Sequence, residues 1–288
     1  MRRCVELLVA SLVMAVIPVI SAFPQKQPSP AGMGWIEFNG KNSFAVTEDE
    51  GLFNLGDRDF TIEAWIYPKD TLEKNNEWVI IAEPANFELL LVGPGNRLLE
   101  KWCKGSNFAF FFVKGFRTTM VCSIRFNDPW IFNKWHHIRL TRGKERMILY
   151  FDGQRRGSGP PEMIDNSVNN IYIGGIPGRQ NSFFDGAMDE MRILTKMLEP
   201  KRQWNFEAKE IEGRLKADKD TIALWHFDDQ GRLKTPLGTD IRSLLKEYGL
   251  LVVVKPWIWQ ASSPPHGRIS RASISSYLGG EEMQEMAC

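Results

Sequence analysis

The chain has 288 residues, an apolar fraction of 43%, a charged fraction of 25% and a formal net charge of +1. Its length suits one large domain or two small ones, and its composition is ordinary for a globular protein. Because the net charge is near zero and basic residues are scattered, we expect no binding to nucleic acid or to an anionic membrane surface. Ten Trp and eighteen Phe residues suit a β-sandwich filled with aromatic side chains.

The N-terminal segment, residues 1–22, has the pattern of a signal peptide. Two arginines follow Met1, residues 5–20 are almost entirely apolar, and cleavage is expected after Ala22. A membrane-spanning helix needs roughly 20 apolar residues, and this run is shorter and contains Pro18. We therefore expect an exported protein, secreted or at the cell surface. The alternative is an uncleaved membrane anchor, which would be the protein's one contact with a membrane.

Residues 23–34 contain three prolines and are predicted to form an extended linker. Strands are then expected at residues 35–38 and 43–47, with a turn at 39–42 between them. The clearest strand is 59–67, where Phe60, Ile62, Ala64 and Ile66 alternate with a second face. The meander continues through predicted strands at 77–82, 87–92, 98–103, 108–114 and 118–126. Short strands at this spacing indicate an all-β sandwich or barrel.

A hairpin at residues 134–155 is the centre of the predicted sheet. Trp135, His137, Arg139 and Thr141 alternate with His136, Ile138 and Leu140, which is the period of a strand with two different faces. A turn at Gly143, a residue able to take positive φ, leads to a second strand at 147–151. Further strands are expected at 171–174 and 186–194.

The C-terminal part changes character after residue 198. Trp204, Ala208, Ile211 and Leu215 stand three and four residues apart, which predicts an amphipathic helix within 199–218 docked on the sandwich. A closing strand follows at 221–227, so 199–229 forms one unit. Residues 230–288 are a C-terminal extension with a predicted strand at 250–254, and its end, rich in Ser, Gly and Pro, is expected to be disordered.

Four segments in this order resemble the laminin-G-like domains of the concanavalin A-like lectin/glucanase superfamily, of the type found in secreted bacterial proteins. In chain order they are residues 60–68, the hairpin with Trp-His-His-Ile and Leu-Tyr-Phe-Asp-Gly, residues 171–175, and the segment Phe-Asp-Gly-Ala-Met-Asp-Glu-Met-Arg-Ile at 184–193. The resemblance covers residues 35–198. It implies an all-β fold, a two-sheet antiparallel jelly-roll sandwich, here with a short C-terminal helix.

The resemblance also implies one structural Ca²⁺ at the sandwich edge. Matching the motif residue by residue gives Asn39, the carbonyl of Gly40, and Asp189 as its ligands. Calcium takes six to eight oxygens, with more than one carboxylate as the rule, and Asn39 stands where family members often carry Asp. The alternative is that Asp189 pairs within the fold. No other cofactor is expected.

Three cysteines remain after cleavage of the signal peptide. Export permits a disulfide, and Cys103 and Cys122 are the natural pair, leaving Cys288 over. Such a bridge would close a loop of about 20 residues and contribute on the order of 3 kcal/mol. The alternative is two reduced, buried thiols.

Catalytic residues are not predicted. A glycosidase on this fold carries acidic residues at alternating positions of one strand, so that two carboxylates share a face, and the chain has no such run. His136 and His137 are adjacent on a strand and face opposite sides, so they cannot bind one ion together.

Ligand binding is instead expected in the loops. Trp78, Trp102 and Trp130 lie near predicted strand ends, where a sugar ring could stack on an indole, and Arg179 and Asn181 could add polar contacts. The alternative for each Trp is a place in the core.

The predicted function is an exported, non-catalytic module that recognises a glycan or an extracellular protein through loops on a rigid sandwich. The alternatives are a structural module of a larger surface complex and, third, a glycan-processing enzyme with an unfamiliar set of residues. The sequence does not indicate an oligomeric state.

Overall fold

A computed structural model describes residues 28–32, 34–47, 55–115, 119–165, 169–201, 205–227 and 251–253. The predictions for the signal peptide, most of the linker and most of the C-terminal extension therefore lie outside the described residues. Within the described part, no helix is long and apolar enough to cross a membrane.

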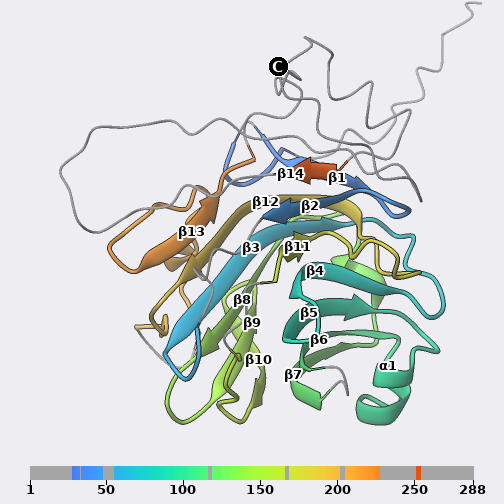
Figure 1. Ribbon diagram of the computed structural model, residues 1–288, viewed down its shortest axis with the longest axis horizontal. Helices are drawn as coiled ribbons and strands as arrows, with labels where there is room; N and C mark the ends of the chain where they lie inside the picture. Colours follow the sequence, from blue (N-terminus) through green and yellow to red (C-terminus); the bar gives the residue numbers. More distant parts are fainter. Residues whose placement is uncertain are drawn as a thin grey trace, which may run out of the picture.

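Two sheets pack face to face in a sandwich (Figure 1). The first sheet has the order β1-β12-β3-β8-β9-β10, and β13 also pairs with β12. Its neighbouring strands are antiparallel throughout. Its members are β1 (Ile36–Asn39), β3 (Phe60–Pro68), β8 (His136–Arg142), β9 (Met147–Phe151), β10 (Gln154–Gly159), β12 (Asp185–Leu194) and β13 (Thr221–Trp225).

The second sheet has the order β14-β2-β11-β4-β5-β6-β7. It is antiparallel except where β14 runs parallel to β2. Its members are β2 (Phe44–Thr47), β4 (Glu77–Glu83), β5 (Phe87–Val92), β6 (Phe108–Lys114), β7 (Thr119–Phe126), β11 (Ile171–Ile173) and β14 (Leu251–Val253). These two sheets confirm the predicted jelly-roll sandwich, and β14 confirms the strand predicted at 250–254.

The main core lies between the sheets and follows the predicted alternation. Phe60, Ile62, Ala64 and Ile66 of β3 all belong to it. Rings from the two sheets meet there; Phe110 of β6 lies 5.7 Å from Phe151 of β9, centroid to centroid. Burial of such side chains is the dominant stabilising term for a sandwich.

The central hairpin also forms as predicted, with Ile138 opposite Phe151 and Arg142 opposite Met147. The role expected for Gly143 was wrong, because its φ is not positive. The position is instead marked by a close neighbour: a Cβ added to Gly143 would lie in close contact with Sδ of Met197. The hairpin tip is therefore packed against the chain that follows β12.

The outer face of the second sheet is covered by a helix that the sequence analysis missed. Residues 98–103 were predicted as a strand, but α1 (Arg97–Trp102) is helical, with the side chain of Asn96 accepting a hydrogen bond from the amide of Leu98 at 2.8 Å. Leu98 and Leu99 pack on Val79, Leu90 and Phe111 in a second apolar cluster. As a result β6 is buried on both faces, in keeping with its unbroken apolar sequence.

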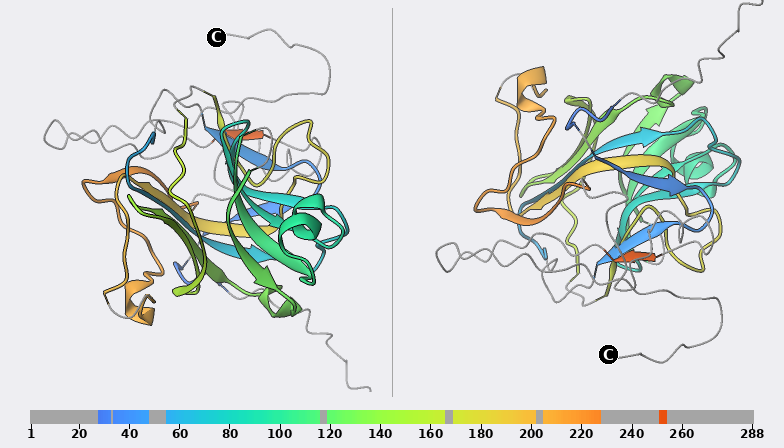
Figure 2. Two further views of the ribbon diagram at one scale, coloured as in Figure 1. Left: turned by 90° about the horizontal axis from the view of Figure 1, so that it is seen from below. Right: turned by 90° about the horizontal axis from the view of Figure 1, so that it is seen from above.

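The helix predicted within 199–218 does not form in the described residues of this segment. A single 3-10 turn, η2 (Ala208–Glu210), stands in its place, closed by a capping box between Glu207 and Glu210. The chain then runs on without helix, because Gly213 lies against the carbonyl of Pro30 and the amide of Leu215 donates to Glu190 at 2.8 Å. We call residues 205–216 the strap; they lie on the outer side of the first sheet (Figure 2).

Three further segments complete the fold. The closing strand predicted at 221–227 is confirmed as β13, which pairs with β12. Residues 28–32, expected to belong to an extended linker, instead form a turn whose Ser29 hydroxyl donates a hydrogen bond to Asp189. A second short 3-10 helix, η1 (Pro129–Ile131), precedes β8.

Candidate functional site

The outer face of the first sheet carries an aromatic group at the end where β3 finishes. Trp65 and Tyr67 point outward from β3, Trp135 immediately precedes β8, and Trp35 immediately precedes β1. The ring of Trp135 lies 6.1 Å from that of Trp35 and 5.5 Å from that of Tyr67, both edge to face. We call these four residues the aromatic patch.

The strand register explains why the rings gather. Ala187 of β12 lies between Glu37 of β1 and Tyr67 of β3, and its small side chain leaves space above the sheet. The three indoles are half-buried, and Tyr67 is 9% exposed. Partly exposed aromatic faces held by neighbouring rings form a rigid, preformed surface for an apolar ligand face.

Polar groups surround this patch. Glu37 is exposed and accepts a hydrogen bond from the indole nitrogen of Trp35 at 2.9 Å. Beside it, the carboxylate of Asp185 at the start of β12 forms an ion pair with Nζ of Lys69 at 3.0 Å and accepts a hydrogen bond from the hydroxyl of Thr71 at 2.9 Å. The patch therefore combines aromatic faces with hydroxyl, carboxylate and ammonium groups at its edge.

The middle of the same face holds a buried charged cluster. Glu63 lies between Arg139 of β8 and Arg192 of β12; its carboxylate is 2.6 Å from Nη2 of Arg139 and 2.8 Å from Nε of Arg192. Burial alone would raise the pKa of Glu63, but Arg139, His137 and Arg192 hold it well below its usual range. Burial lowers the pKa of His137, so that this ring is neutral at pH 7.

The strap closes over the charged cluster. The ring of Phe206 lies 3.9 Å from the guanidinium carbon of Arg139, and the carbonyl of Lys216 accepts a hydrogen bond from Arg192 at 2.5 Å. The indole nitrogen of Trp65 donates to the carbonyl of Glu212 at 3.2 Å. The strap thus covers the middle of the sheet and fixes Trp65 at the border of the aromatic patch.

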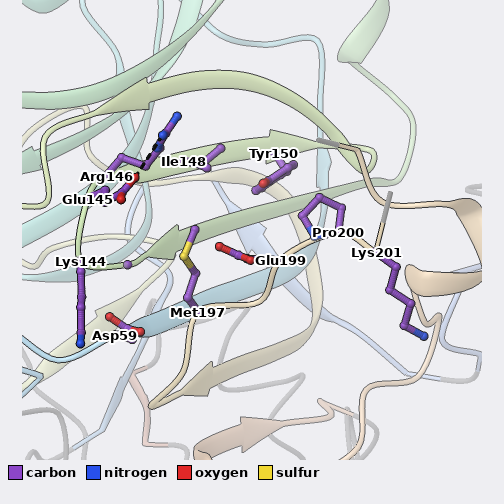
Figure 3. A pocket seen from close by; sticks show the side chains of 11 residues that line it. Asp59, Lys144, Glu145, Arg146, Ile148, Tyr150, Met197, Glu199, Pro200 and Lys201 are labelled. Carbon is purple, nitrogen blue, oxygen red and sulfur yellow. Dashed lines mark hydrogen bonds and ion pairs between the residues drawn. The ribbon is translucent and has the colours of Figure 1, made fainter. Parts of the chain in front are cut away.

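A pocket of about 510 Å³ lies at the opposite end of this face, beside the tip of the central hairpin (Figure 3). Ile148 and Tyr150 of β9 line it together with Met197. Its charged lining is balanced, with three acidic and three basic residues: Asp59, Glu145, Glu199, Lys144, Arg146 and Lys201. Lys144 and Lys201 lie at opposite ends of the pocket and do not converge. A ligand site usually joins an apolar lining to a few convergent polar groups, so the aromatic patch is the better candidate.

The three Trp residues predicted to bind ligand are not brought together. Trp78 is 2% exposed and belongs to the main core, where it lies 5.4 Å from Phe184. Trp102 is in α1 on the outer face of the second sheet, with Nζ of Lys101 4.5 Å from its ring. Trp130 is 37% exposed but lies in η1, edge-on to Phe126 and Phe151.

Arg179 and Asn181, the two predicted polar contacts, have structural partners. Arg179 binds the carboxylate of Glu88 with both distances at 2.7 Å and also pairs with Glu77. Asn181 has a φ of 61°, and its carbonyl accepts the amide of Glu77 at 2.8 Å. Both residues hold the loop before β12 against β4 and β5.

The ligands expected for calcium are also separated. Asn39 pairs with Asp185, whereas Asp189 stands four residues further along β12, about 13 Å away at the usual rise of a strand. The buried carboxylate of Asp189 accepts the Ser29 hydroxyl and the amide of Glu190. Asp189 therefore pairs within the fold, the alternative considered above.

The disulfide expected between Cys103 and Cys122 does not form; both are free, buried thiols. Cys103 belongs to the cluster beneath α1, whereas Cys122 faces the core between the sheets. The backbone of the second sheet separates the two sulfurs, because the predicted strand at 98–103 is a helix on the outer face. Burial raises the pKa of the Cys122 thiol, so the thiol stays protonated and unreactive.

A family model described as the concanavalin A-like lectin/glucanases superfamily matches residues 39–202, which is more than half of the chain. The protein therefore belongs to this superfamily, and the resemblance inferred from the four segments is confirmed. No curated protein matches the chain at a significant level of similarity.

Solved structures give similar folds at low identity. A candidate carbohydrate-binding protein from Bacteroides ovatus has 17% identity and a TM-score of 0.45, over 67% of this chain and 52% of that chain. Domains LG4–5 of mouse laminin alpha1 have 18% identity and a TM-score of 0.41, over 62% and 45%.

A third similar structure is domain 4 of an extracellular GH43 arabinanase from Geobacillus stearothermophilus in complex with arabinotriose. It has 18% identity and a TM-score of 0.39, over 57% of this chain and 71% of that chain. The chain spans about half the length of the Bacteroides and mouse proteins. At these identities the likeness extends to the fold alone.

Proposed function

We propose that the protein is an exported, non-catalytic carbohydrate-binding module that holds its ligand on the aromatic patch. The observation that carries this proposal is the group of half-buried rings, Trp35, Trp65 and Trp135 around Tyr67, on the outer face of the first sheet. Export is proposed from the signal-peptide pattern of residues 1–22.

The chemistry of the patch suits a sugar. The C–H face of a pyranose or furanose ring packs on an indole, and its hydroxyls then need donors and acceptors at the rim. Glu37 and Lys69 supply both kinds of group beside the rings. Because the rings come from the sheet and from residues directly before β1 and β8, the site is rigid and a ligand orders few side chains on binding.

A binding role without catalysis is supported by the state of three buried carboxylates of this sheet. Glu63 is enclosed by two guanidinium groups and the strap. The carboxylate of Glu190 accepts a hydrogen bond from the amide of Leu215 and lies within hydrogen-bond distance of Nδ1 of His226. Asp189 is held by Ser29. A retaining or inverting glycosidase needs two carboxyl groups that reach the substrate, and these three are buried and engaged.

A glycan array probed with the chain lacking residues 1–22, in parallel with its Trp135→Ala variant, tests the proposal. We expect selective binding to a set of oligosaccharides and a loss of affinity of at least about 30-fold in the variant, as for the removal of a central aromatic contact. The matched control is Trp130→Ala, which removes an exposed indole at another rim and should bind normally. A flat array, or equal losses in both variants, would contradict the proposal, and a flat array would favour an extracellular protein as the partner.

A further inference from the structure

The corner where β1 turns toward β2 is the place at which the family resemblance leads one to expect a structural cation. Gly40, with a φ of 70°, lies directly against Asp185; a Cβ added to Gly40 would stand 2.8 Å from the Cβ of Asp185. Lys69 and Thr71, which follow β3, complete this corner. Asp189 does not belong to it, because it stands four residues further along β12.

The oxygen atoms of the corner are occupied by protein donors. The side-chain oxygen of Asn39 accepts the amides of Lys41, Asn42 and Ser43 at 2.9–3.1 Å and the Ser43 hydroxyl at 2.9 Å. The carbonyl of Asp185 accepts the amide of Lys69 at 2.9 Å, and the carbonyl of Phe184 accepts that of Gly40 at 3.0 Å. A calcium ion takes six to eight oxygens, and an oxygen that faces several N–H groups is a poor ligand for a cation.

The charge of the corner is also balanced internally. One oxygen of the Asp185 carboxylate pairs with Nζ of Lys69 at 3.0 Å, and the other accepts a hydrogen bond from the hydroxyl of Thr71 at 2.9 Å. The side chain of Asp185 is only 19% exposed, so its negative charge is partly removed from water. A partly buried carboxylate is stable when it has a cation and hydrogen-bond donors, and Lys69 and Thr71 provide both.

We infer that the ammonium group of Lys69 takes the place of a structural metal ion at this corner, which makes the domain independent of calcium. Two of the residues that the family resemblance assigns to calcium, Asn39 and Asp189, lie apart and accept hydrogen bonds from protein donors. The carboxylate that does lie at the turn is neutralised by a lysine. This inference does not depend on the proposed function, because thermal unfolding measures the stability of the corner, although Lys69 also stands at the rim of the aromatic patch.

The test is thermal unfolding of the full chain in 10 mM CaCl₂ and in EDTA, for the wild type and for Lys69→Glu. The wild type is expected to melt at the same temperature in both solutions. Lys69→Glu puts a second carboxylate beside Asp185 in place of the ammonium, and we expect its Tm to rise by about 2–4 °C in calcium. Terbium luminescence sensitised by the neighbouring aromatic rings should appear in this variant and not in the wild type.

Two further variants make the result decisive. Lys69→Glu combined with Asp185→Asn removes the original carboxylate and should lose the calcium response. Lys69→Gln removes the ammonium without adding charge, and its Tm should rise in calcium by about 1–2 °C, which preserves the test if Lys69→Glu does not fold. A wild type that is stabilised by calcium, a lack of response in both single variants, or a response that survives Asp185→Asn would overturn the inference.

Discussion

The carboxylate of Glu63 lies 2.6 Å from Nη2 of Arg139, on a sheet face from which both side chains are shielded from water. This pair divides the outer face of the first sheet into three parts. Phe206 of the strap covers the pair, the aromatic patch lies toward the end of β3, and the charged pocket lies toward the central hairpin. The charged cluster therefore stabilises the middle of the face, and the proposed recognition site is the aromatic patch beside it.

Replacing Glu63 by Gln should destabilise the protein strongly. The variant leaves two buried guanidinium groups without their counter-ion, and breaking a buried ion pair from one side costs about 3–5 kcal/mol. The free energy of unfolding from urea titration measures this loss. Glu145→Gln, at the exposed hairpin tip, is the control and should change stability by less than about 0.5 kcal/mol. A loss under about 1 kcal/mol for Glu63→Gln would mean that the cluster is not a major support of the fold.

Stability should fall in two steps as the pH is lowered. His137 is buried beside Glu63, Arg139 and Trp65, and burial lowers its pKa below the ordinary value of 6.5, so the unfolded chain takes up a proton at a higher pH than the folded protein does. Its contribution is complete above pH 6.5 and is lost as the pH falls below that value. The pKa of Glu63 is also depressed, so its contribution is lost below about pH 4.5, the ordinary value of a Glu carboxyl.

Urea titrations at pH 7.5, 5.5 and 4.0 measure both steps. In His137→Gln the loss between pH 7.5 and 5.5 should be smaller than in the wild type, while the loss toward pH 4.0 remains. An identical pH profile in the two proteins would show that His137 does not titrate as its burial requires.

The strap should loosen when Phe206 is replaced by Ala. The ring covers Arg139 and lies 4.9 Å from Tyr150, so its removal exposes the charged cluster to water. We expect a loss of about 1–3 kcal/mol, below the value for a fully buried Phe, and faster hydrogen exchange at residues 205–216. Phe44→Ala, a half-buried ring on the other sheet, should leave exchange in the strap unchanged. Unchanged exchange in Phe206→Ala would show that other contacts hold the strap.

Cys103 and Cys122 should be reduced in the purified protein. They face opposite sides of the second sheet, so the fold gives them no route to a bond. Alkylation of the unfolded chain without reductant, followed by peptide mass spectrometry, should find both cysteines modified. A peptide pair linked through Cys103 and Cys122 would contradict the packing of α1 described above.

The sandwich could be predicted from the sequence because its signal is local. Alternation along β3 and β8 gives the inward face of each strand directly, and the family motifs give the order of the strands. The errors lie where short apolar patterns are ambiguous. Leu98 and Leu99 fit a buried strand as well as the helix that Asn96 caps, and the apolar spacing of the strap is interrupted at Gly213.

The candidate site was harder to predict because it depends on which strands become neighbours. Trp35 and Trp135 are 100 positions apart in the chain and meet only because β1, β12, β3 and β8 lie side by side. A signal was present: Trp65, Tyr67 and Trp135 stand on the polar face of their strands, among Glu, Arg and His residues. Large aromatic residues on such a face indicate a surface that binds something, whereas Trp78, which is followed by the apolar run Val79 to Ala82, belongs to the core.

The position of the ligand can be read directly from the indole N–H resonances of the ten Trp residues during titration with an oligosaccharide that binds on the array. The resonances of Trp35, Trp65 and Trp135 should shift together and saturate at one dissociation constant, while those of Trp78, Trp102 and Trp225 stay in place. Shifts confined to Trp130 or Trp102 would move recognition from the face of the first sheet to the loops and contradict the proposed site.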